Sequence, residues 1–210
     1  MPPQAETFTI TGLADRARKM AAMPGRTIIG IAGPPGAGKS TVAEALVREL
    51  GPAAVLVPMD GFHLSNQVLQ SLGRRDRKGA PDTFDVAGYV AMLQRLRSPG
   101  ADVVYAPAYR REIEEPIGSS IPVPPDAPIV ITEGNYLLLD RDPWRQVRDL
   151  LDAVWYLEAD DAVRVRRLTA RHVEFGKTPD AARAWAEGSD QRNADIVTAS
   201  AHRADLVLRL

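Results

Sequence analysis

Residues 33–40 constrain this chain more than any other feature, because their sequence, GPPGAGKS, fits the pattern GxxxxGK[ST]. A short β-branched run, RTIIGIAG, precedes the segment, and a helical pattern, STVAEALVREL, follows it. Glycines let successive backbone N–H groups point at phosphate oxygens, and the following helix presents its positive N-terminus to the same anion. We therefore expect ATP phosphates to bind here, at Gly33, Pro34, Pro35, Gly36, Ala37, Gly38, Lys39, Ser40 and Thr41.

Three side chains are candidates for contacts with the charged groups of the nucleotide. Lys39 is expected to reach the β- and γ-phosphates as a catalytic residue, and the Ser40 hydroxyl to ligate Mg²⁺. Glu133 closes the apolar run IVITEG, where a carboxylate can hold the same ion directly or through water. The expected cofactors are thus ATP and Mg²⁺.

The order of apolar and helical segments predicts an α/β fold. Apolar runs at 26–33, 53–60, 129–134, 153–159 and 204–210 read as strands, and helical patterns occur at 11–23, 40–50, 85–97 and 161–175. Strands that alternate with helices imply a parallel sheet with helices on both faces. The length of 210 residues suits a single domain, 1–210.

Two segments interrupt this alternation. Residues 61–128 are too long for one crossover, and such an insert usually lies at the carboxyl ends of the strands, where ligands bind. Residues 176–189 read either as a mobile lid or as an ordinary connection between helices.

The charge and composition exclude several partners. The formal net charge of −1 argues against a nucleic-acid binder, which is normally basic. No apolar run reaches the ~18 residues of a membrane span, and the first residues lack a secretory pattern. The absence of Cys is compatible with a reducing compartment, so we expect a cytoplasmic protein, with a monomer and a homodimer both open.

The distribution of lysine narrows the class of nucleotide-binding protein. Only four of the 26 basic residues are Lys, at positions 19, 39, 78 and 177, and none begins the K-x-D motif with which Ras-type GTPases read guanine. No LSGGQ-like segment supports an ABC ATPase, and Thr132-Glu133 stands where motor and helicase ATPases commonly carry Asp-Glu. A kinase of small molecules remains.

Such a kinase needs a group that receives the acceptor's proton. Asp60 follows the second apolar run, in PMDGFH, where strand ends converge on the ligand crevice. Its carboxylate could orient or deprotonate a hydroxyl for attack on the γ-phosphate. The alternative is a structural Asp in a turn, since Asp-Gly is a frequent loop dipeptide.

The motifs, taken in order, resemble a known group of kinases. The segments GPPGAGKS, MDGFHLSNQVL, RKGAPDTFD, VYAPAYRREIEEPI and VITEGNYLLL resemble the pantothenate kinase / uridine kinase / phosphoribulokinase group of P-loop kinases. Within it, the chain looks most like the bacterial subgroup designated fructose transport system kinases. The resemblance spans about Arg26 to the C-terminus. It implies a P-loop NTPase three-layer sandwich with five parallel strands in the order 2-3-1-4-5.

The resemblance also assigns roles to residues. The strand-two Asp of these kinases, proposed as catalytic base, falls on Asp60, and their strand-three Glu near Mg²⁺ falls on Glu133. Their lid arginines fall on the helix after strand four, where Arg164, Arg167 and Arg171 share one face. We expect Arg167 and Arg171 to neutralise charge on the γ-phosphate as catalytic residues, and Lys177 in the segment 176–189 is a further candidate.

Four residues are expected to bind the acceptor: His63, Asp85, Tyr109 and Arg111. Asp85 lies in the substrate-side motif, but it is also placed to cap a helix that begins at Val86. Tyr109 and Arg111 lie where related kinases have an acceptor-contacting hairpin, although a surface ion-pair cluster with Glu114 and Glu115 is an alternative for Arg111. The basic run 74–78 could attract an anionic substrate but is interpreted as a solvated loop, and the three Trp as core or helix-packing residues.

The sequence thus predicts an ATP- and Mg²⁺-dependent kinase that phosphorylates a hydroxyl of a small molecule. The resemblance points to a sugar such as fructose. The segment AYRREIEEP lacks the His of uridine kinase and pantothenate kinase hairpins, which disfavours those two acceptors. The alternatives are a pantothenate- or nucleoside-type kinase and a non-catalytic ATP-binding regulatory module.

Overall fold

A parallel β-sheet forms the centre of the protein. The computed structural model describes residues 5–98, 100 and 102–209. In this part of the chain the main sheet has six strands in the order β1-β8-β7-β2-β6-β3. Their bounds are β1 Ala5–Thr7, β2 Thr27–Ala32, β3 Ala54–Leu56, β6 Ile129–Gly134, β7 Ala153–Glu158 and β8 Leu206–Arg209.

The predicted strand order is confirmed, and the predicted strand number is one too low. Read from β3 to β8, the five expected strands stand in the order 2-3-1-4-5. The additional strand, β1, pairs in parallel with β8, with Ala5 opposite Val207. Its three residues, AET, carry no apolar run that could have signalled a strand, because an edge strand of this length is defined by its neighbour.

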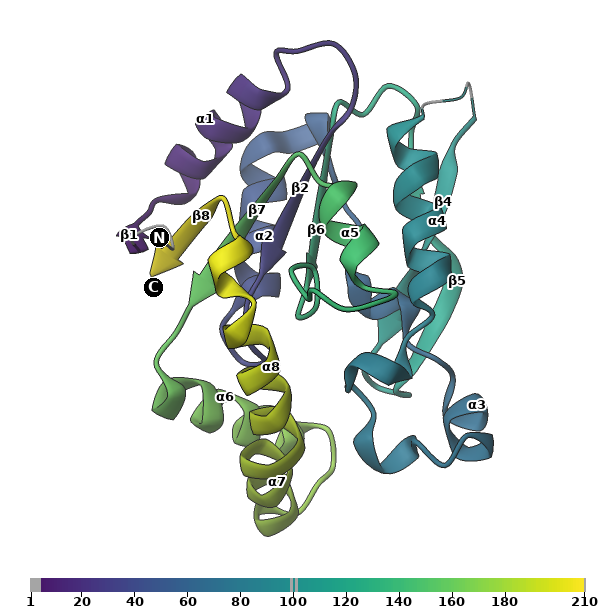
Figure 1. Ribbon diagram of the computed structural model, residues 1–210, viewed down its shortest axis with the longest axis vertical. Helices are drawn as coiled ribbons and strands as arrows, with labels where there is room; N and C mark the ends of the chain where they lie inside the picture. Colours follow the sequence, from purple (N-terminus) through teal and green to yellow (C-terminus); the bar gives the residue numbers. More distant parts are fainter. Residues whose placement is uncertain (1–4, 99, 101, 210) are drawn as a thin grey trace.

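Helices cover both faces of this sheet, which confirms the three-layer architecture (Figure 1). Helices α1 (Ile10–Met20) and α2 (Lys39–Leu50) enclose one apolar core with β2, β6 and β7. Helices α4 (Val86–Arg97), α5 (Arg145–Asp149) and α8 (Gln191–Ala199) contribute to the core on the other face. All six residues of β2 and of β6 are buried, as a strand covered on both faces requires.

Part of the insert 61–128 runs alongside the sheet, with α4 packed on one face, and part of it extends beyond the carboxyl ends of the strands (Figure 1). It contains helix α3 (Asn66–Ser71), helix α4 and an antiparallel hairpin of β4 (Val104–Arg110) and β5 (Glu115–Val123). The stretch 116–123, PIGSSIPV, thus belongs to a strand although it contains two prolines. Pro116 and Pro122 are tolerated because β5 pairs with only one partner strand, β4, in the described structure.

A second lobe follows β7. Helix α6 (Asp161–Glu174) leads through a short turn to α7 (Pro179–Trp185), and a π-helical turn (Ala186–Asp190) joins α7 to α8. The side chain of Asp160 caps α6, and that of Thr178 caps α7. Residues 176–189 are thus mostly helical, and a lid function for them stays a prediction.

Short 3-10 turns complete the described structure, at Gly51–Ala53, Met59–Phe62, Arg75–Arg77, Pro81–Thr83 and Ala201–Arg203. In the part of the chain that is described, no helix has the length and apolar character needed to cross a bilayer.

Candidate active site

The segment 33–38 forms a loop between β2 and α2, as the sequence predicts. Gly36 and Gly38 have φ values of 80° and 97°, a left-handed region that favours glycine. A Cβ atom on Gly36 would also lie 2.8 Å from the carbonyl oxygen of Arg164 on α6. Glycine is therefore needed at position 36 both for the turn and for the close approach of the lobe helix.

A cavity opens on this loop, and we name it the phosphate cavity. It is lined by Gly36, Gly38, Lys39, Ser40, Thr41, Arg111, Arg167, Leu168 and Arg171. Five of the nine predicted phosphate-loop residues thus face it. The other four contribute differently: for example, the carbonyl of Pro34 accepts a hydrogen bond from Lys39.

Lys39 is held in place before any phosphate binds. Its Nζ donates to Asn135 Oδ1 at 2.7 Å and to the Pro34 carbonyl at 3.1 Å. Burial lowers the pKa of Lys39 to about 8, although the nearby Glu133 and Asp60 carboxylates oppose this effect. No sequence motif singles out Asn135, whose only signal is its place directly after Gly134 in VITEGN.

ATP binding to the free protein is expected to weaken above about pH 8. Below that pH the Lys39 ammonium is charged and attracts the phosphates; above it the charge is lost. The Kd of a non-hydrolysable ATP analogue should rise by up to about tenfold per pH unit above that point. Titration calorimetry across this range checks it, and Lys39→Arg should abolish the dependence because a guanidinium stays charged. A Kd that is constant up to about pH 10 would contradict the prediction.

Ser40 and Glu133 form the predicted metal-binding pair. The Ser40 hydroxyl donates to Glu133 Oε1 at 3.0 Å, and Glu133 is buried at the end of β6. Burial, with a contribution from Asp60, raises the pKa of Glu133, so a cation would favour its ionised form. Among the described residues no group of three or more His, Cys, Asp or Glu side chains could hold a metal. Mg²⁺ needs no such group, since it usually takes one or two protein oxygens with phosphates and water, so the pair fits Mg²⁺.

Asp60 lies in the 3-10 turn that follows β3. Its Oδ2 is 3.4 Å from the Arg111 guanidinium, and its backbone carbonyl is 2.7 Å from His63 Nδ1. Burial opposes ionisation of the carboxyl, but His63, Arg111, Lys39 and Arg171 together hold the pKa of Asp60 below its usual value. The carboxylate is therefore charged at neutral pH and able to accept a proton or a hydrogen bond.

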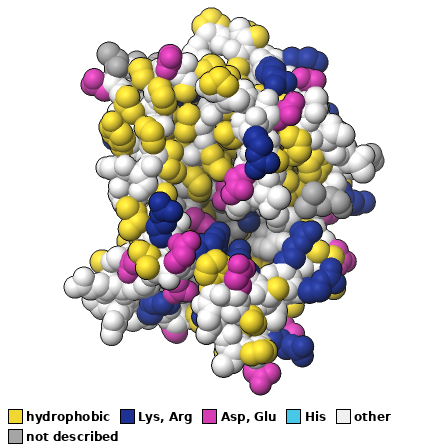
Figure 2. Space-filling model, turned by 180° about the vertical axis from the view of Figure 1, so that it is seen from behind, with side chains coloured by type: hydrophobic (Ala, Val, Ile, Leu, Met, Phe, Trp, Pro, Cys, Tyr) yellow, Lys and Arg dark blue, Asp and Glu magenta, His cyan; other side chains and the backbone are white. Residues whose placement is uncertain are grey.

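A second cavity, which we name the acceptor cavity, surrounds this carboxylate. Asp60, His63, Tyr109 and Arg111 line it, so the structure brings these four candidate residues together, and their roles stay predictions. The alternative of a surface ion-pair cluster for Arg111 is wrong, because Arg111 pairs with Asp60 while Glu114 pairs with Arg75. Figure 2 shows Lys and Arg side chains gathered around a hollow on one face of the molecule.

Asp85 does not join this group. It is exposed, it does not line the acceptor cavity, and its Oδ1 accepts a hydrogen bond of 2.8 Å from the Gly88 backbone. Its prediction as an acceptor-binding residue is therefore corrected: in this structure Asp85 caps α4. A short side chain with an oxygen atom, one residue before a helix, accepts a hydrogen bond from a backbone N–H that would otherwise lack a partner.

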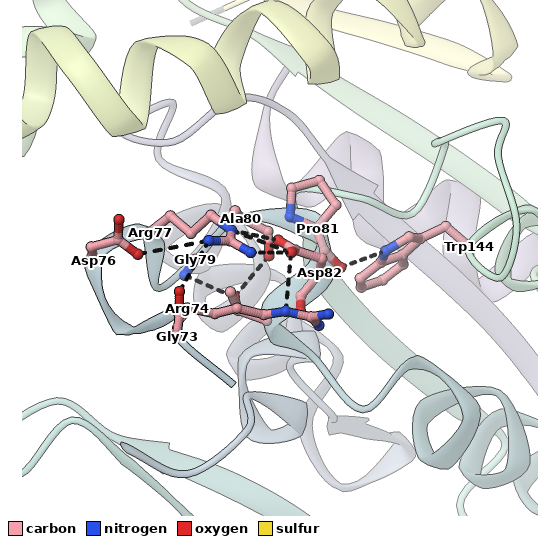
Figure 3. Close-up of polar contacts among 10 residues, drawn as sticks. Gly73, Arg74, Asp76, Arg77, Gly79, Ala80, Pro81, Asp82 and Trp144 are labelled. Atoms are coloured by element: carbon pink, nitrogen blue, oxygen red, sulfur yellow. Dashed lines mark hydrogen bonds and ion pairs between the residues drawn. The ribbon is translucent and has the colours of Figure 1, made fainter. Parts of the chain in front are cut away.

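The loop between α3 and α4 brings an unexpected residue to the cavity. Lys78 is only 9% exposed and lines the acceptor cavity, so the interpretation of the basic run as a solvated loop is wrong for it. Figure 3 shows how the adjoining residues are held: the Arg77 guanidinium pairs with Asp82 at 2.8 Å, and Trp144 Nε1 donates to the Pro81 carbonyl at 3.0 Å.

The three arginines on one face of α6 have different environments. Arg164 is buried and bonds to Asp161, the Pro35 carbonyl and Gln191. Arg167 is exposed and lines only the phosphate cavity. Arg171 lines both cavities, and burial lowers its pKa. The geometry therefore brings Arg171 closest to a junction between the two cavities.

The acceptor cavity contains further residues, of which the sequence offers only Lys177 as a candidate. His172 Nε2 lies 2.7 Å from Asp190 Oδ2, and the Lys177 Nζ lies 4.6 Å from the centre of the Trp185 ring. Trp185 is half-buried and lines this cavity, unlike Trp144 and Trp155, which are core residues as predicted. These contacts join residues far apart in the chain, so no local motif announces them.

Comparison with known proteins gives a consistent result. The phosphoribulokinase / uridine kinase family profile matches residues 28–209. A crystal structure of a protein described as a "putative fructose transport system kinase" from Silicibacter sp. TM1040 is 36% identical, with a TM-score of 0.86 over 95% of this chain and 98% of that one. The YggC protein of Escherichia coli strain K12 is 35% identical over 88% of this chain and 78% of its own length. A Schizosaccharomyces pombe protein designated a "putative uridine kinase" is 32% identical over 94% of this chain and 88% of its own length.

Proposed function

We propose that this chain, which belongs to the phosphoribulokinase / uridine kinase family, transfers the γ-phosphate of ATP to a hydroxyl group of a sugar-like small molecule. The family assignment makes it a P-loop kinase of small molecules. One observation carries the finer proposal: Arg111 and Arg171 line both the phosphate cavity and the acceptor cavity. A γ-phosphate on the loop and a hydroxyl at Asp60 could therefore meet between these two cations.

Asp60 is the group proposed to bind the hydroxyl of the acceptor and to take its proton. Its carboxylate is ionised, partly buried and next to the junction of the cavities. It would accept a hydrogen bond from the hydroxyl, orient the oxygen for in-line attack and take the proton as the phosphoryl group transfers. A turn role alone would not require the carboxylate to face two arginines and a lysine.

The cations around the phosphate cavity are proposed to stabilise the charge of the transferring group. Lys39 is fixed by Asn135 and would contact the β- and γ-phosphates. Arg171, and with a weaker contribution Arg167, would bind the γ-phosphate oxygens from α6. Mg²⁺, which Ser40 and Glu133 would hold, would neutralise phosphate charge when bound.

The domain organisation follows from the same arrangement. We treat residues 1–210 as one kinase domain in which the insert 61–128 supplies one wall of the acceptor cavity, through His63, Lys78 and Tyr109. The segment 176–189 supplies part of the opposite wall, through Lys177 and Trp185, as a lid would.

The acceptor is first sought among sugars. The similar Silicibacter protein is described with fructose, and the similar yeast protein with uridine, so fructose and uridine are the first neutral acceptors to compare. Pantothenate, which carries a carboxylate, is a charged acceptor to compare with them. A regulatory module that binds ATP without transfer would not need Asp60 and Arg171 to face one cavity, which favours the kinase.

A coupled assay of ADP release over sugars, polyols, nucleosides and pantothenate tests the proposal. Turnover that depends on one acceptor class, with the phosphorylated product identified by mass spectrometry, is the expected result. Uniform background hydrolysis across the whole panel, in protein shown to bind ATP, would contradict the kinase and favour the regulatory module.

A further inference from the structure

The acceptor cavity contains more positive charge than its own carboxylates neutralise. Its lining includes five Lys and Arg side chains but only three carboxylates. Each carboxylate has a partner within the cavity: Glu114 pairs with Arg75 at 2.6 Å, Asp190 with His172 at 2.7 Å, and Asp60 with Arg111 at 3.4 Å. The remaining cations are therefore available to a ligand.

Lys78 is the most constrained of these remaining cations. Its Nζ donates to Asn66 Oδ1 at 2.7 Å and to the backbone carbonyl of Glu114, and both of these acceptors are neutral. Among the described residues no carboxylate lies within 4 Å of this ammonium. Two of its three N–H donors are thus used, and one remains.

The burial of Lys78 makes this arrangement unfavourable without a ligand. A buried ammonium without a direct ion pair has a desolvation penalty, and burial lowers the pKa of Lys78, although the Glu115 and Glu114 carboxylates nearby partly oppose this effect. The side chain also stacks over the Tyr109 ring, with its Nζ 5.4 Å from the ring centre. The Lys78 ammonium is therefore held at a fixed point on the cavity wall by Asn66 of α3 and by the β4–β5 hairpin.

Lys177 adds a second unpaired cation from the opposite lobe. It lies over Trp185 at the start of the lid segment, and no carboxylate of the described residues pairs with it. Three of the four lysines in this Arg-rich chain, Lys39, Lys78 and Lys177, thus line the two cavities. A lysine ammonium is a compact point charge on a flexible stem, which suits a single anionic group.

On the premise of the kinase function, we propose that the acceptor is a polyol that carries an anionic group of its own, a phosphate or a carboxylate, and that Lys78 and Lys177 bind this group. Lys78 makes no ion pair with Asp60. The anionic group of the acceptor would therefore bind at Lys78, apart from the hydroxyl group that binds at Asp60. A neutral sugar would leave both ammonium groups without a direct ion pair.

Acceptor selectivity of the wild-type protein is the first test. We expect kcat/KM to be about 10- to 100-fold higher for charged than for neutral acceptors, from the strength of a hydrogen bond to a charged group. The panel is fructose, fructose 1-phosphate, fructose 6-phosphate and gluconate. Fructose is the neutral reference, the two sugar phosphates test for a phosphate group, and gluconate tests for a carboxylate. Equal or better turnover of fructose would overturn the anionic acceptor and leave the kinase function standing.

Substitution of Lys78 is the second test. Lys78→Met should raise KM for the charged acceptor by about 10- to 100-fold, with a smaller change in kcat and in KM for ATP. Lys19→Met, at an exposed position on α1, is the matched control and should change neither constant. An unchanged ratio of charged to neutral turnover in a folded Lys78→Met protein would overturn the proposal. If that variant does not fold, Lys177→Met at a half-buried position replaces it.

Binding measurements separate a failure of this proposal from a failure of the kinase function. The same four compounds and inorganic phosphate are titrated calorimetrically into wild-type protein and both lysine variants. Lysine-dependent binding of the anions without turnover of any compound would support the anion site and contradict the kinase. Binding that does not depend on either lysine would overturn the anion site.

Discussion

Asp60→Asn is expected to lower kcat by about 10²- to 10⁴-fold, the range attributed to a positioned general base. Asn keeps the size of the side chain and a hydrogen-bonding oxygen, but it cannot accept the acceptor's proton. Because Asp60 does not line the phosphate cavity, the Kd of an ATP analogue should change by no more than about threefold. Steady-state ADP release and calorimetry on the same protein provide both numbers.

Asp85→Asn is the matched control for this substitution. The change is chemically identical, but Asp85 is exposed and caps α4, where Asn serves nearly as well as Asp. Its kcat and KM should stay at the wild-type values. A fully active Asp60→Asn protein would remove Asp60 from the chemistry, and a strong loss in Asp85→Asn would restore the role that the sequence motif suggests.

Arg171→Ala is expected to lower kcat by about 10³-fold, at the low end of the effect of an arginine that binds the transferring phosphoryl group. Arg171 is half-buried at the junction of the two cavities, where a missing positive charge is poorly replaced by water. Arg167→Ala should have a smaller effect, of about tenfold, because Arg167 is exposed and reaches only the phosphate cavity.

Arg166→Ala controls for the loss of a basic residue from α6. Arg166 is exposed and lines neither cavity, so its removal should leave turnover unchanged. Rates are compared at saturating ATP and acceptor, which separates the transfer step from binding. If Arg167→Ala proves as damaging as Arg171→Ala, the assignment of the γ-phosphate contact to Arg171 is wrong.

The parts of the fold that the sequence predicts are those with local signals. Strands β2 and β6 are covered on both faces, so each reads as a continuous apolar run, and the turn at 33–38 is specified by its own glycines. Strand β1 could not be predicted, because its pairing with β8 joins the two ends of the chain.

The same distinction applies to the candidate site. Asp60 and Glu133 follow apolar runs, and their positions in the sequence bring them to the carboxyl edge of the sheet. Lys78 is buried only because residues of α3 and the hairpin fold over it, and the sequence around it reads as a polar loop. The sequence shows that Arg164 and Arg171 share a helical face. It does not show that Arg164 contacts the phosphate loop.

The contacts of Arg164 have a mechanical consequence. Its guanidinium joins α6 to the Pro35 carbonyl and to Gln191 of α8, while Leu168 packs close to Gly36. Swinging α6 away from the phosphate loop would break all of these contacts together, whereas Gly176, with a φ of 95°, lies beyond them at the start of the lid segment. If the segment 176–189 moves as the predicted lid, Gly176 is a point at which it could pivot, and Arg171 would stay on the phosphate loop while Lys177 and α7 move.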